Sequence, residues 1–258
     1  MGKIIAIANQ KGGVGKTTTA VNLCAALTKR DRKVLLVDCD PQGNATTGMG
    51  IKKKTVKSIY DVLLRDVPAK DAVTVTKYGS VLSANADLAG ANVELVPIER
   101  REYLLKEKLE PLRSKYDYIW LDCPPSLELL TLNALAAADS VLIPVQSEFY
   151  ALEGLSDLEN TIRLVKLRMN PTLEIEGLVV TMCDSRTKLS TDVEDALRKY
   201  YPGKVYKNTV PRNVRLSEAP SHGKPCIVYD KSSRGSRAYL HVANEFLKRQ
   251  KGAMNGDE

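Results

Sequence analysis

Residues 9–18 read Asn-Gln-Lys-Gly-Gly-Val-Gly-Lys-Thr-Thr, and this stretch decides the fold of the chain. It follows a short apolar run, residues 4–8, and precedes a segment with helical periodicity that begins near Thr17. A strand, a glycine-rich loop and a helix in this order form a phosphate-binding loop, or P-loop. The glycines allow successive backbone N–H groups to face the phosphates at the helix N-terminus. The stretch therefore predicts a nucleotide site.

Each part of the loop has an expected task. Lys16 is expected to bridge the β- and γ-phosphates, and the Thr17 hydroxyl is expected to bind Mg²⁺. A glycine-rich turn that binds nothing is the alternative, and it is the weaker one because the strand, lysine and threonine are all in place. The residues expected to surround ATP are Gly12, Gly13, Val14, Gly15, Lys16, Thr17 and Thr18.

The composition fits one α/β domain. The chain has 258 residues, of which 43% are hydrophobic, enough for a substantial core. Apolar runs alternate with helix-period segments, which is typical of a mostly parallel, twisted sheet with helices on both faces. We expect a single domain over residues 1–251 and a disordered tail over residues 252–258. No apolar run reaches the roughly 20 residues that span a bilayer, and no signal peptide is evident, so we expect a cytoplasmic protein.

The order of the expected elements follows from these runs. The expected strands are 3–8, 34–38, 81–84, 118–122, 141–145, 178–182 and 205–210. The expected helices are 17–29, 58–64, 102–115, 129–137, 152–169, 191–200 and 234–248.

Acidic residues end two of the expected strands. One strand closes on Asp38-Cys39-Asp40-Pro41-Gln42-Gly43-Asn44, and another closes on Asp122-Cys123-Pro124-Pro125-Ser126. Ligands of open α/β sheets lie at the carboxyl ends of the strands, so both segments should lie beside the P-loop. Carboxylates at this edge suit Mg²⁺ binding and the positioning of water. Simple solvation of strand ends is the alternative, and two such ends beside one P-loop argue against it.

The loop departs from the usual P-loop pattern in one respect. Gln10 stands where a glycine is common, and a second lysine, Lys11, follows it. In this the loop resembles the deviant Walker A loop of the ParA/MinD/nitrogenase-iron-protein class of dimeric P-loop ATPases. In that class the extra lysine reaches across a nucleotide sandwich, so the resemblance implies an ATP-dependent homodimer and a catalytic role for Lys11.

The two acidic segments resemble switch I and switch II of the ParA/Soj branch of that class. This resemblance implies that Asp40 orients the attacking water and that Asp122 serves Mg²⁺. It also implies that Asp38 supports the metal shell from further out.

Two later segments, residues 144–154 and 210–225, are also similar to the ParA/Soj branch. The first implies that Glu148 meets the extra lysine or the ribose across the dimer, although a surface glutamate without a role is the alternative. The second implies that Pro211 and Asn213 border the adenine.

Positive charge is concentrated in the last third of the chain. Residues 1–179 carry 23 Lys/Arg and 22 Asp/Glu, whereas residues 180–258 carry 15 and 9. No helix-turn-helix signature or aromatic platform accompanies these charges, so any DNA binding should be non-specific and sensitive to salt. A solvated basic face is the alternative. By resemblance to ParA/Soj and by charge, the candidate DNA-binding residues are Arg186, Lys188, Arg215, Lys224 and Arg234.

The resemblance covers about residues 1–248 and implies a function. It implies a slow ATPase that binds double-stranded DNA on the nucleoid as an ATP-bound homodimer and drives chromosome or plasmid partitioning. A ParB/Spo0J-type centromere-binding protein would stimulate hydrolysis. A MinD-like membrane-cycling ATPase is one alternative, disfavoured by the acidic end of the tail. A metabolic or cluster-carrying enzyme on the same fold is another, although the five cysteines lack C-x-x-C spacing.

Overall fold

The sheet of the protein is built from seven strands in the order β3-β4-β2-β5-β1-β6-β7. This description comes from a computed structural model, in which residues 1–148, 151–184 and 186–254 are described. Six strands run parallel and β3 pairs antiparallel with β4 at one edge. The expected α/β fold with a mostly parallel sheet is confirmed. The strands are β1 (Lys3–Ile7), β2 (Val34–Asp38), β3 (Val73–Thr76), β4 (Gly79–Leu82), β5 (Tyr118–Asp122), β6 (Ser140–Gln146) and β7 (Glu174–Thr181).

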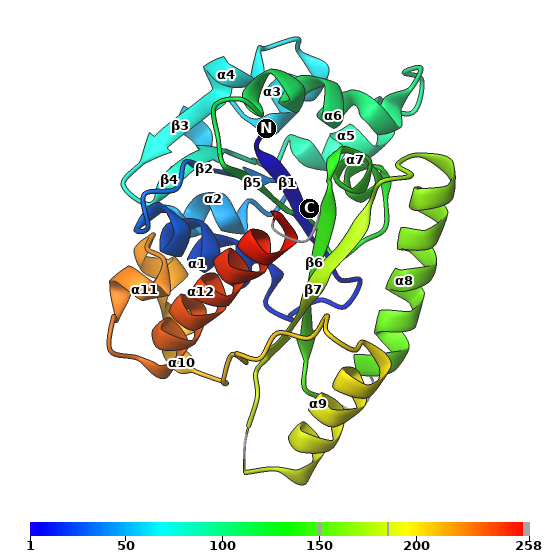
Figure 1. The fold of residues 1–258 in the computed structure, drawn as a ribbon. Coiled ribbons are helices and arrows are strands. Elements are labelled where there is room, and N and C mark those ends of the chain that lie inside the picture. Colours follow the sequence, from blue (N-terminus) through cyan, green and yellow to red (C-terminus); the bar gives the residue numbers. More distant parts are fainter. Residues whose placement is uncertain (149–150, 185, 255–258) are drawn as a thin grey trace.

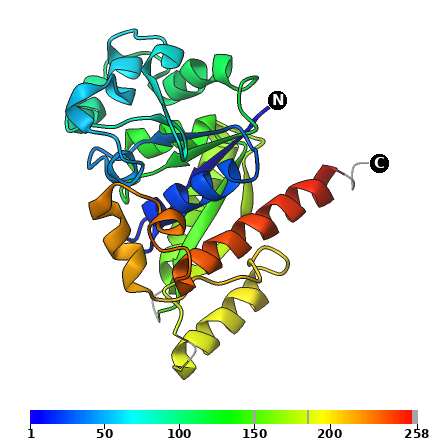
Figure 2. The same ribbon diagram turned by 90° about the vertical axis from the view of Figure 1, so that its left-hand side faces the viewer.

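Helices cover both faces of this sheet (Figure 1, Figure 2). The central strands are therefore apolar on both sides, and all five residues of β2 are buried. One face packs on α1 (Lys16–Thr28), α2 (Asn44–Gly48), α11 (Cys226–Tyr229) and α12 (Arg234–Met254). The other face packs on α3 (Ile59–Leu64), α4 (Ala69–Ala72), α5 (Leu88–Glu94), α6 (Leu104–Leu109), α7 (Leu129–Ala137), α8 (Ala151–Arg168) and α9 (Lys188–Tyr200).

Alternate residues of the strands supply the two cores. Ile4 and Ala6 belong to one core, and Ile5 and Ile7 belong to the other. On the second face Trp120 is fully buried and its ring lies 5.1 Å from that of Phe246 on α12. This contact fixes α12 against the centre of the sheet, on the same face as the P-loop helix α1.

One expected strand, residues 205–210, is wrong. In the described chain these residues run beside β7 with an isolated bridge between Leu178 and Val205, and a second bridge joins Cys183 to Pro211 just beyond both segments. Val205 and Val210 are buried, so the segment shares the apolar pattern of a strand without its continuous hydrogen bonding.

One expected helix, residues 102–115, is broken into pieces. A 3₁₀ turn (Arg101–Tyr103) precedes α6, and a second 3₁₀ turn (Glu110–Leu112) follows it. Pro111 lies in the second turn, where its missing N–H and its ring disfavour a continuing α-helix.

The ends of the described chain lie at the amino edge of the sheet. The Lys3 ammonium donates to Gln250 Oε1 at 2.9 Å and to Glu176 Oε2 at 2.6 Å. Helix α12 as described ends at Met254, inside the segment expected to be a disordered tail, and residues 255–258 of that segment lie outside the described residues. Among the described helices, none combines the length and apolar character that crossing a membrane requires.

Candidate nucleotide-binding site

The loop between β1 and α1 adopts the backbone that its glycines allow. Gly13 and Gly15 have φ of 76° and 90°, in the left-handed region that side chains disfavour. Lys16 opens α1, and its ammonium donates to the carbonyl oxygen of Lys11 at 3.0 Å, across the loop. The Thr181 hydroxyl on β7 donates to the carbonyl oxygen of Val14 at 2.8 Å. The loop is thereby held in an open curve at the carboxyl edge of the sheet.

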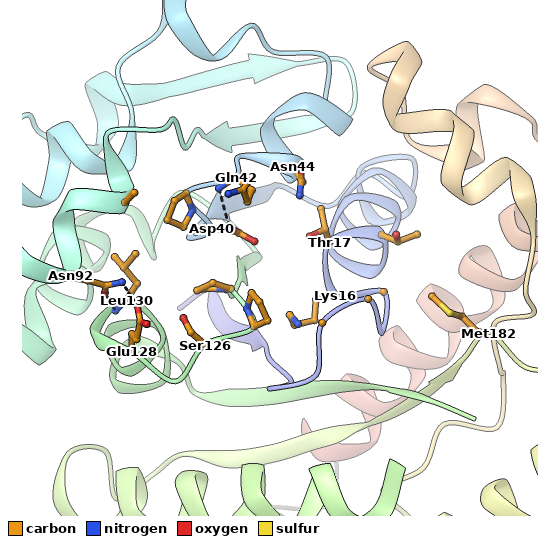
Figure 3. Close-up of a pocket in the computed structure, with 18 residues that line it drawn as sticks. Lys16, Thr17, Asp40, Gln42, Asn44, Asn92, Ser126, Glu128, Leu130 and Met182 are labelled. Carbon is orange, nitrogen blue, oxygen red and sulfur yellow. Dashed lines mark hydrogen bonds between the residues drawn. The ribbon is translucent and has the colours of Figure 1, made fainter. Parts of the chain in front are cut away.

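A cavity of about 680 Å³ lies in front of this loop (Figure 3). Lys16 and Thr17 line one side of it, together with Gly12, Gly13 and Thr18. The other side comes from the segments after β2 and β5, which meet the loop as the sequence predicted. From these segments, the cavity is lined by Asp40, Pro41, Gln42, Asn44, Pro124, Pro125 and Ser126.

Two aspartates lie side by side at the ends of β2 and β5. Asp38 and Asp122 are paired in register across the two parallel strands, and both side chains are fully buried. Asp38 accepts hydrogen bonds from the backbone N–H and hydroxyl of Thr46, at 2.8 and 2.7 Å. By contrast, neither carboxylate oxygen of Asp122 has a hydrogen-bond partner among the described residues. A buried carboxylate without a partner is costly, so this environment fits a bound cation.

The surroundings of Asp122 also shift its protonation. Burial raises its pKa well above the usual range, and the neighbouring charge of Asp38 adds to this effect. Thr17 and Lys16 act in the opposite direction, although Thr17 is outside normal hydrogen-bond geometry with Asp122. Burial likewise raises the pKa of Asp38, and its hydrogen bonds from Thr46 oppose that rise.

The oxygens around this position are the kind that Mg²⁺ prefers. The Asp122 carboxylate and the Thr17 hydroxyl supply two oxygen ligands, and Mg²⁺ usually takes the rest from phosphates and water. The described residues include no group of three or more His, Cys, Asp or Glu side chains placed to hold a metal ion. Asp122 and Thr17 could therefore hold Mg²⁺ jointly with the phosphates of a nucleotide.

Asp40 occupies the side of the cavity opposite Lys16. Its Oδ1 accepts a hydrogen bond from the backbone N–H of Gln42 at 2.9 Å, and the turn closed by this bond fixes the carboxylate (Figure 3). Asp40 is partly exposed, unlike Asp38 and Asp122, so it reaches the cavity rather than the core. Its free oxygen is available to a water molecule in front of the loop.

The second lysine of the loop meets a carboxylate of its own chain. The Lys11 ammonium lies 2.9 Å from Glu148 Oε2, and Gln146 donates to the other oxygen of Glu148. Both partners of the ion pair are partly exposed, so the pair is screened by water and adds little stability. The ParA/Soj resemblance implies that Glu148 meets the extra lysine or the ribose across a dimer, and within this single chain Glu148 pairs with its own Lys11.

Known proteins resemble this chain along almost its whole length. A family model described as an AAA domain matches residues 2–175. Sporulation initiation inhibitor protein Soj of Bacillus subtilis is 58% identical over 248 residues, 95% of this chain and 98% of that protein. Chromosome partitioning protein ParA of Myxococcus xanthus is 55% identical over 252 residues, 96% of this chain and 89% of that protein.

The chain belongs to the ParA/Soj family of ATPases.

A solved structure shares both the fold and much of the sequence. It is that of cobyrinic acid a,c-diamide synthase from Mycobacterium smegmatis with bound ADP and magnesium. Its TM-score is 0.86 at 39% identity, and the match covers 98% of this chain and 97% of that chain.

A second cavity, of about 460 Å³, adjoins the first behind the P-loop. Gly15, Thr18 and Met182 line both cavities, so the two are neighbours. Pro211 and Asn213, the residues that the ParA/Soj resemblance assigned to the adenine, both line this second cavity. Asn213 also caps α10 (Val214–Glu218), where its side chain accepts the N–H of Arg215.

Met182 is a cavity residue that the sequence reasoning missed. The expected strand ended at this residue, whereas β7 ends at Thr181 and Met182 turns into the left-handed region with φ of 54°. Such a backbone is uncommon for a residue other than glycine and often marks a functional site. No signal in the sequence separates this methionine from a strand residue.

The candidate DNA-binding residues of this ParA/Soj chain fall into two groups. The first is at the start of α9, where the side chain of Arg186 is 87% exposed and pairs with Asp184. The second is in the segment 212–237, where Arg215 pairs with Glu218 and Asp230. Lys188 belongs to the first group, and Lys224 and Arg234 belong to the second; all three are exposed.

The backbone joins these two groups. The N–H of Cys183 donates to Val210 at 3.0 Å, and the N–H of Arg212 donates to Cys183 at 3.2 Å. The chain leading to Arg186 therefore runs beside the chain leading to Arg215. In Figure 1 α9 and α10 lie at the same end of the molecule.

Proposed function

We propose that this chain is an ATP-driven switch that dimerises in the ATP state, binds double-stranded DNA without sequence specificity and drives chromosome or plasmid partitioning. One observation carries the proposal. Lys16 and the partly exposed Asp40 line one cavity, and the unpartnered, buried Asp122 lies two residues before Pro124 in its wall, in a chain that is 58% identical to Soj. The partitioning role comes from the name of the Myxococcus relative, chromosome partitioning protein ParA.

The two neighbouring cavities support ATP binding. The phosphates would lie against the N–H groups of the P-loop and the Lys16 ammonium, and the base would lie between Pro211 and Asn213. Burial lowers the pKa of Lys16, and the carboxylate of Asp122 opposes that shift. Thr17 and Asp122 would hold Mg²⁺, which neutralises charge on the β- and γ-phosphates when bound.

Hydrolysis needs a positioned water, and Asp40 is placed to hold one. Its carboxylate is fixed by the Gln42 N–H and faces the side of the cavity where the γ-phosphate would end. Asp38 accepts two hydrogen bonds from Thr46 and so would act at a distance from the metal, by fixing the segment that carries Asp40. Positioning and electrostatic stabilisation account for most of the catalysis in phosphoryl transfer.

A partner should accelerate this reaction. The residues that line the phosphate cavity beside Lys16, all in the described part of the chain, include no arginine that would stabilise charge in the transition state. Intrinsic turnover would therefore be slow. The partner that the family resemblance implies is a ParB/Spo0J-type protein.

Dimerisation rests on the exposed rim of the P-loop. Gly12 is exposed, and a Cβ placed on it would meet nothing within 4 Å in the described chain. The open side of this glycine is where a second copy would close over the nucleotide. Lys11 lies beside it and would exchange Glu148 for the phosphates of the partner's nucleotide.

DNA binding would use both basic groups. Each group alone is small, and two copies of each in a dimer would make a larger footprint on the phosphate backbone. Arg186, Lys188, Arg215, Lys224 and Arg234 would contribute phosphate contacts. This would place the ATP state on the nucleoid.

A metabolic role is the second candidate, because the Mycobacterium smegmatis structure carries the name of a diamide synthase. The identity is 39% in that comparison and 58% with Soj, at similar coverage of this chain. The partitioning role is therefore the better supported of the two.

The first test is binding to random-sequence duplex DNA with ATP, with ADP and without nucleotide. Asp40→Ala would hold the ATP state, because it should keep nucleotide affinity and slow hydrolysis strongly. We expect tight binding only with ATP, and an affinity that falls steeply with salt. Phosphate release by the unmodified protein, absent in Lys16→Ala, checks the ATPase in parallel.

The matched control is Arg186→Glu with Arg215→Glu. This double variant should no longer bind DNA, and it should still dimerise with ATP, as measured by light scattering. DNA binding that is absent in every nucleotide state would refute the proposal, and normal binding by the double variant would refute the assigned surface. Binding to lipid vesicles with ATP would instead favour a membrane-cycling ATPase.

A further inference from the structure

A lysine-rich segment lies outside both basic groups. Residues 52–57 read Lys-Lys-Lys-Thr-Val-Lys, with four lysines in six positions, between α2 and α3. Lys52, Lys54 and Lys57 are exposed. Neither Lys54 nor Lys57 forms an ion pair with a carboxylate of the described chain. We call residues 52–57 the lysine segment.

The lysine segment is hydrogen-bonded to the segment after β2 that lines the phosphate cavity. The ammonium of Lys53 donates to the backbone carbonyl of Gln42, a residue that lines the phosphate cavity. Gln42 in turn donates its N–H to Asp40. Two successive hydrogen bonds therefore link Lys53 to the proposed water-positioning carboxylate.

The lysine segment is also close to the second basic group. A Cβ on Gly50 would lie 2.9 Å from the carbonyl oxygen of Gly223, and one on Gly223 would lie 3.1 Å from the Cα of Gly50. Both glycines have positive φ, so their backbones touch where side chains could not fit. Lys224 is the residue after Gly223, and Lys52 lies two residues after Gly50. The Cα atoms of Lys52 and Lys224 are therefore at most about 16 Å apart.

This distance is well within one turn of a DNA duplex, which is roughly 34 Å long. Figure 2 shows the chain after α2 and the orange segment around α10 next to one another at one side of the molecule. Lys54 and Lys57 follow Lys52 by two and five residues and both are exposed, so they would extend the basic surface around Lys224.

The chemistry of this surface suits phosphates better than a protein partner. Protein interfaces have a desolvated core of large apolar or aromatic side chains. Among the exposed large hydrophobic residues of the described chain, Val214 alone falls within residues 50–57 or 212–237. Flexible lysines without apolar neighbours are typical of non-specific phosphate-backbone contacts.

We propose that the lysine segment contacts the phosphate backbone of duplex DNA and extends the footprint of the second basic group. The proposal rests on the DNA binding proposed above and adds residues that the sequence comparison with the family did not assign. Because the segment is attached to Gln42, it also places a DNA contact directly beside the nucleotide switch.

The test uses Lys54→Gln with Lys57→Gln, and a matched control of Lys70→Gln with Lys115→Gln. Both pairs remove two exposed lysines that have no carboxylate partner in the described chain, and the control pair lies outside the basic surface. The affinity of the full chain for random-sequence duplex DNA is measured with ATP across a salt series. The slope of log affinity against log salt should become shallower by about 0.9 for each phosphate that the protein no longer neutralises.

We expect the lysine-segment variant to show a slope that is shallower by about one to two such phosphates, while the control keeps the slope of the unmodified protein. Nucleotide affinity and basal ATP hydrolysis should be unchanged in both, which excludes misfolding. If the unmodified protein binds DNA and both variants share its slope, the lysine segment is a solvated face. If the variant loses affinity for phosphatidylglycerol vesicles and not for DNA, the partner is a membrane surface and the proposal is wrong. Absence of DNA binding by the unmodified protein would instead refute the function proposed above.

Discussion

Asp122 lowers the stability of the folded protein whenever it is ionised, because both of its buried oxygens lack hydrogen-bond partners in the described chain. Asp122→Asn removes that charge and keeps the shape of the side chain. We expect the nucleotide-free variant to be more stable by on the order of 1 kcal/mol, since the uncharged amide is less costly to bury. Thermal unfolding without metal or nucleotide measures this. The variant should also lose the additional stabilisation that Mg²⁺ gives together with ATP.

The pH dependence of this gain has a defined sign. The folded pKa of Asp122 is raised, so the folded state holds a proton that the unfolded state releases as the pH rises above 3.8. Stability of the unmodified protein therefore falls as the pH rises from about that value through the folded pKa. The advantage of Asp122→Asn should grow over the same window and vanish at its acidic end. An advantage that is constant with pH would mean that ionisation of Asp122 is not its cause.

Single residues differ in how well the sequence predicts them. Lys16, Thr17 and Asp40 could be placed around one cavity, with Asp122 at the strand end beside it, because strand ends and glycine loops obey simple rules of parallel sheets. Met182 could not, because its left-handed backbone results from contacts that no local pattern encodes.

Helix α2 shows how a short element positions the site. Thr46 near its start donates its hydroxyl to Asp38 at 2.7 Å and accepts the N–H of Ala84 at 2.9 Å. This one side chain links the ends of β2 and β4 to the segment that carries Asp40. Sequence patterns missed α2 because its five residues, Asn44–Gly48, are too few to show a helical period.

Thr46→Val tests this link. The change keeps the shape but leaves the Ala84 N–H without its acceptor and removes one donor from Asp38. We expect a loss of about 1–3 kcal/mol in unfolding free energy, measured by urea denaturation, together with slower ATP hydrolysis. Thr47→Val is the neighbouring control, since Thr47 is half-buried and bonds only within its own turn. Equal losses of unfolding free energy in the two variants would show that the hydrogen bonds of Thr46 to Asp38 and Ala84 contribute no more stability than that of Thr47.

Elements in the sheet were more predictable than those around it. The apolar runs of β2 and β5 match the structure at both ends because strands buried on two faces must be apolar throughout. Residues 205–210 carry the same pattern without joining the sheet, since burial alone does not provide a continuous partner strand. Hydrophobic periodicity reports burial, and hydrogen bonding decides whether a buried segment is a strand.

At the scale of the whole molecule, Gly12→Val separates folding from association. A side chain at this position meets nothing within 4 Å of the described single chain, and Gly12 does not need positive φ. We expect unchanged thermal stability and retained ATP binding, but no ATP-dependent dimer in light scattering, because the valine would occupy the closing surface. Gly13→Val is the contrasting variant, since its φ of 76° disfavours any side chain and should cost stability directly. A normal Gly12→Val dimer would place the interface elsewhere.

The contact between Lys3 and Gln250 has a practical consequence for microscopy. It brings both ends of the described chain to the amino edge of the sheet, whereas the cavity lies at the carboxyl edge, about 16 Å away along a five-residue strand. A fluorescent reporter fused at either end would therefore be carried on the opposite side from the nucleotide. Such fusions should report the position of the protein in living cells without obstructing the nucleotide cavity.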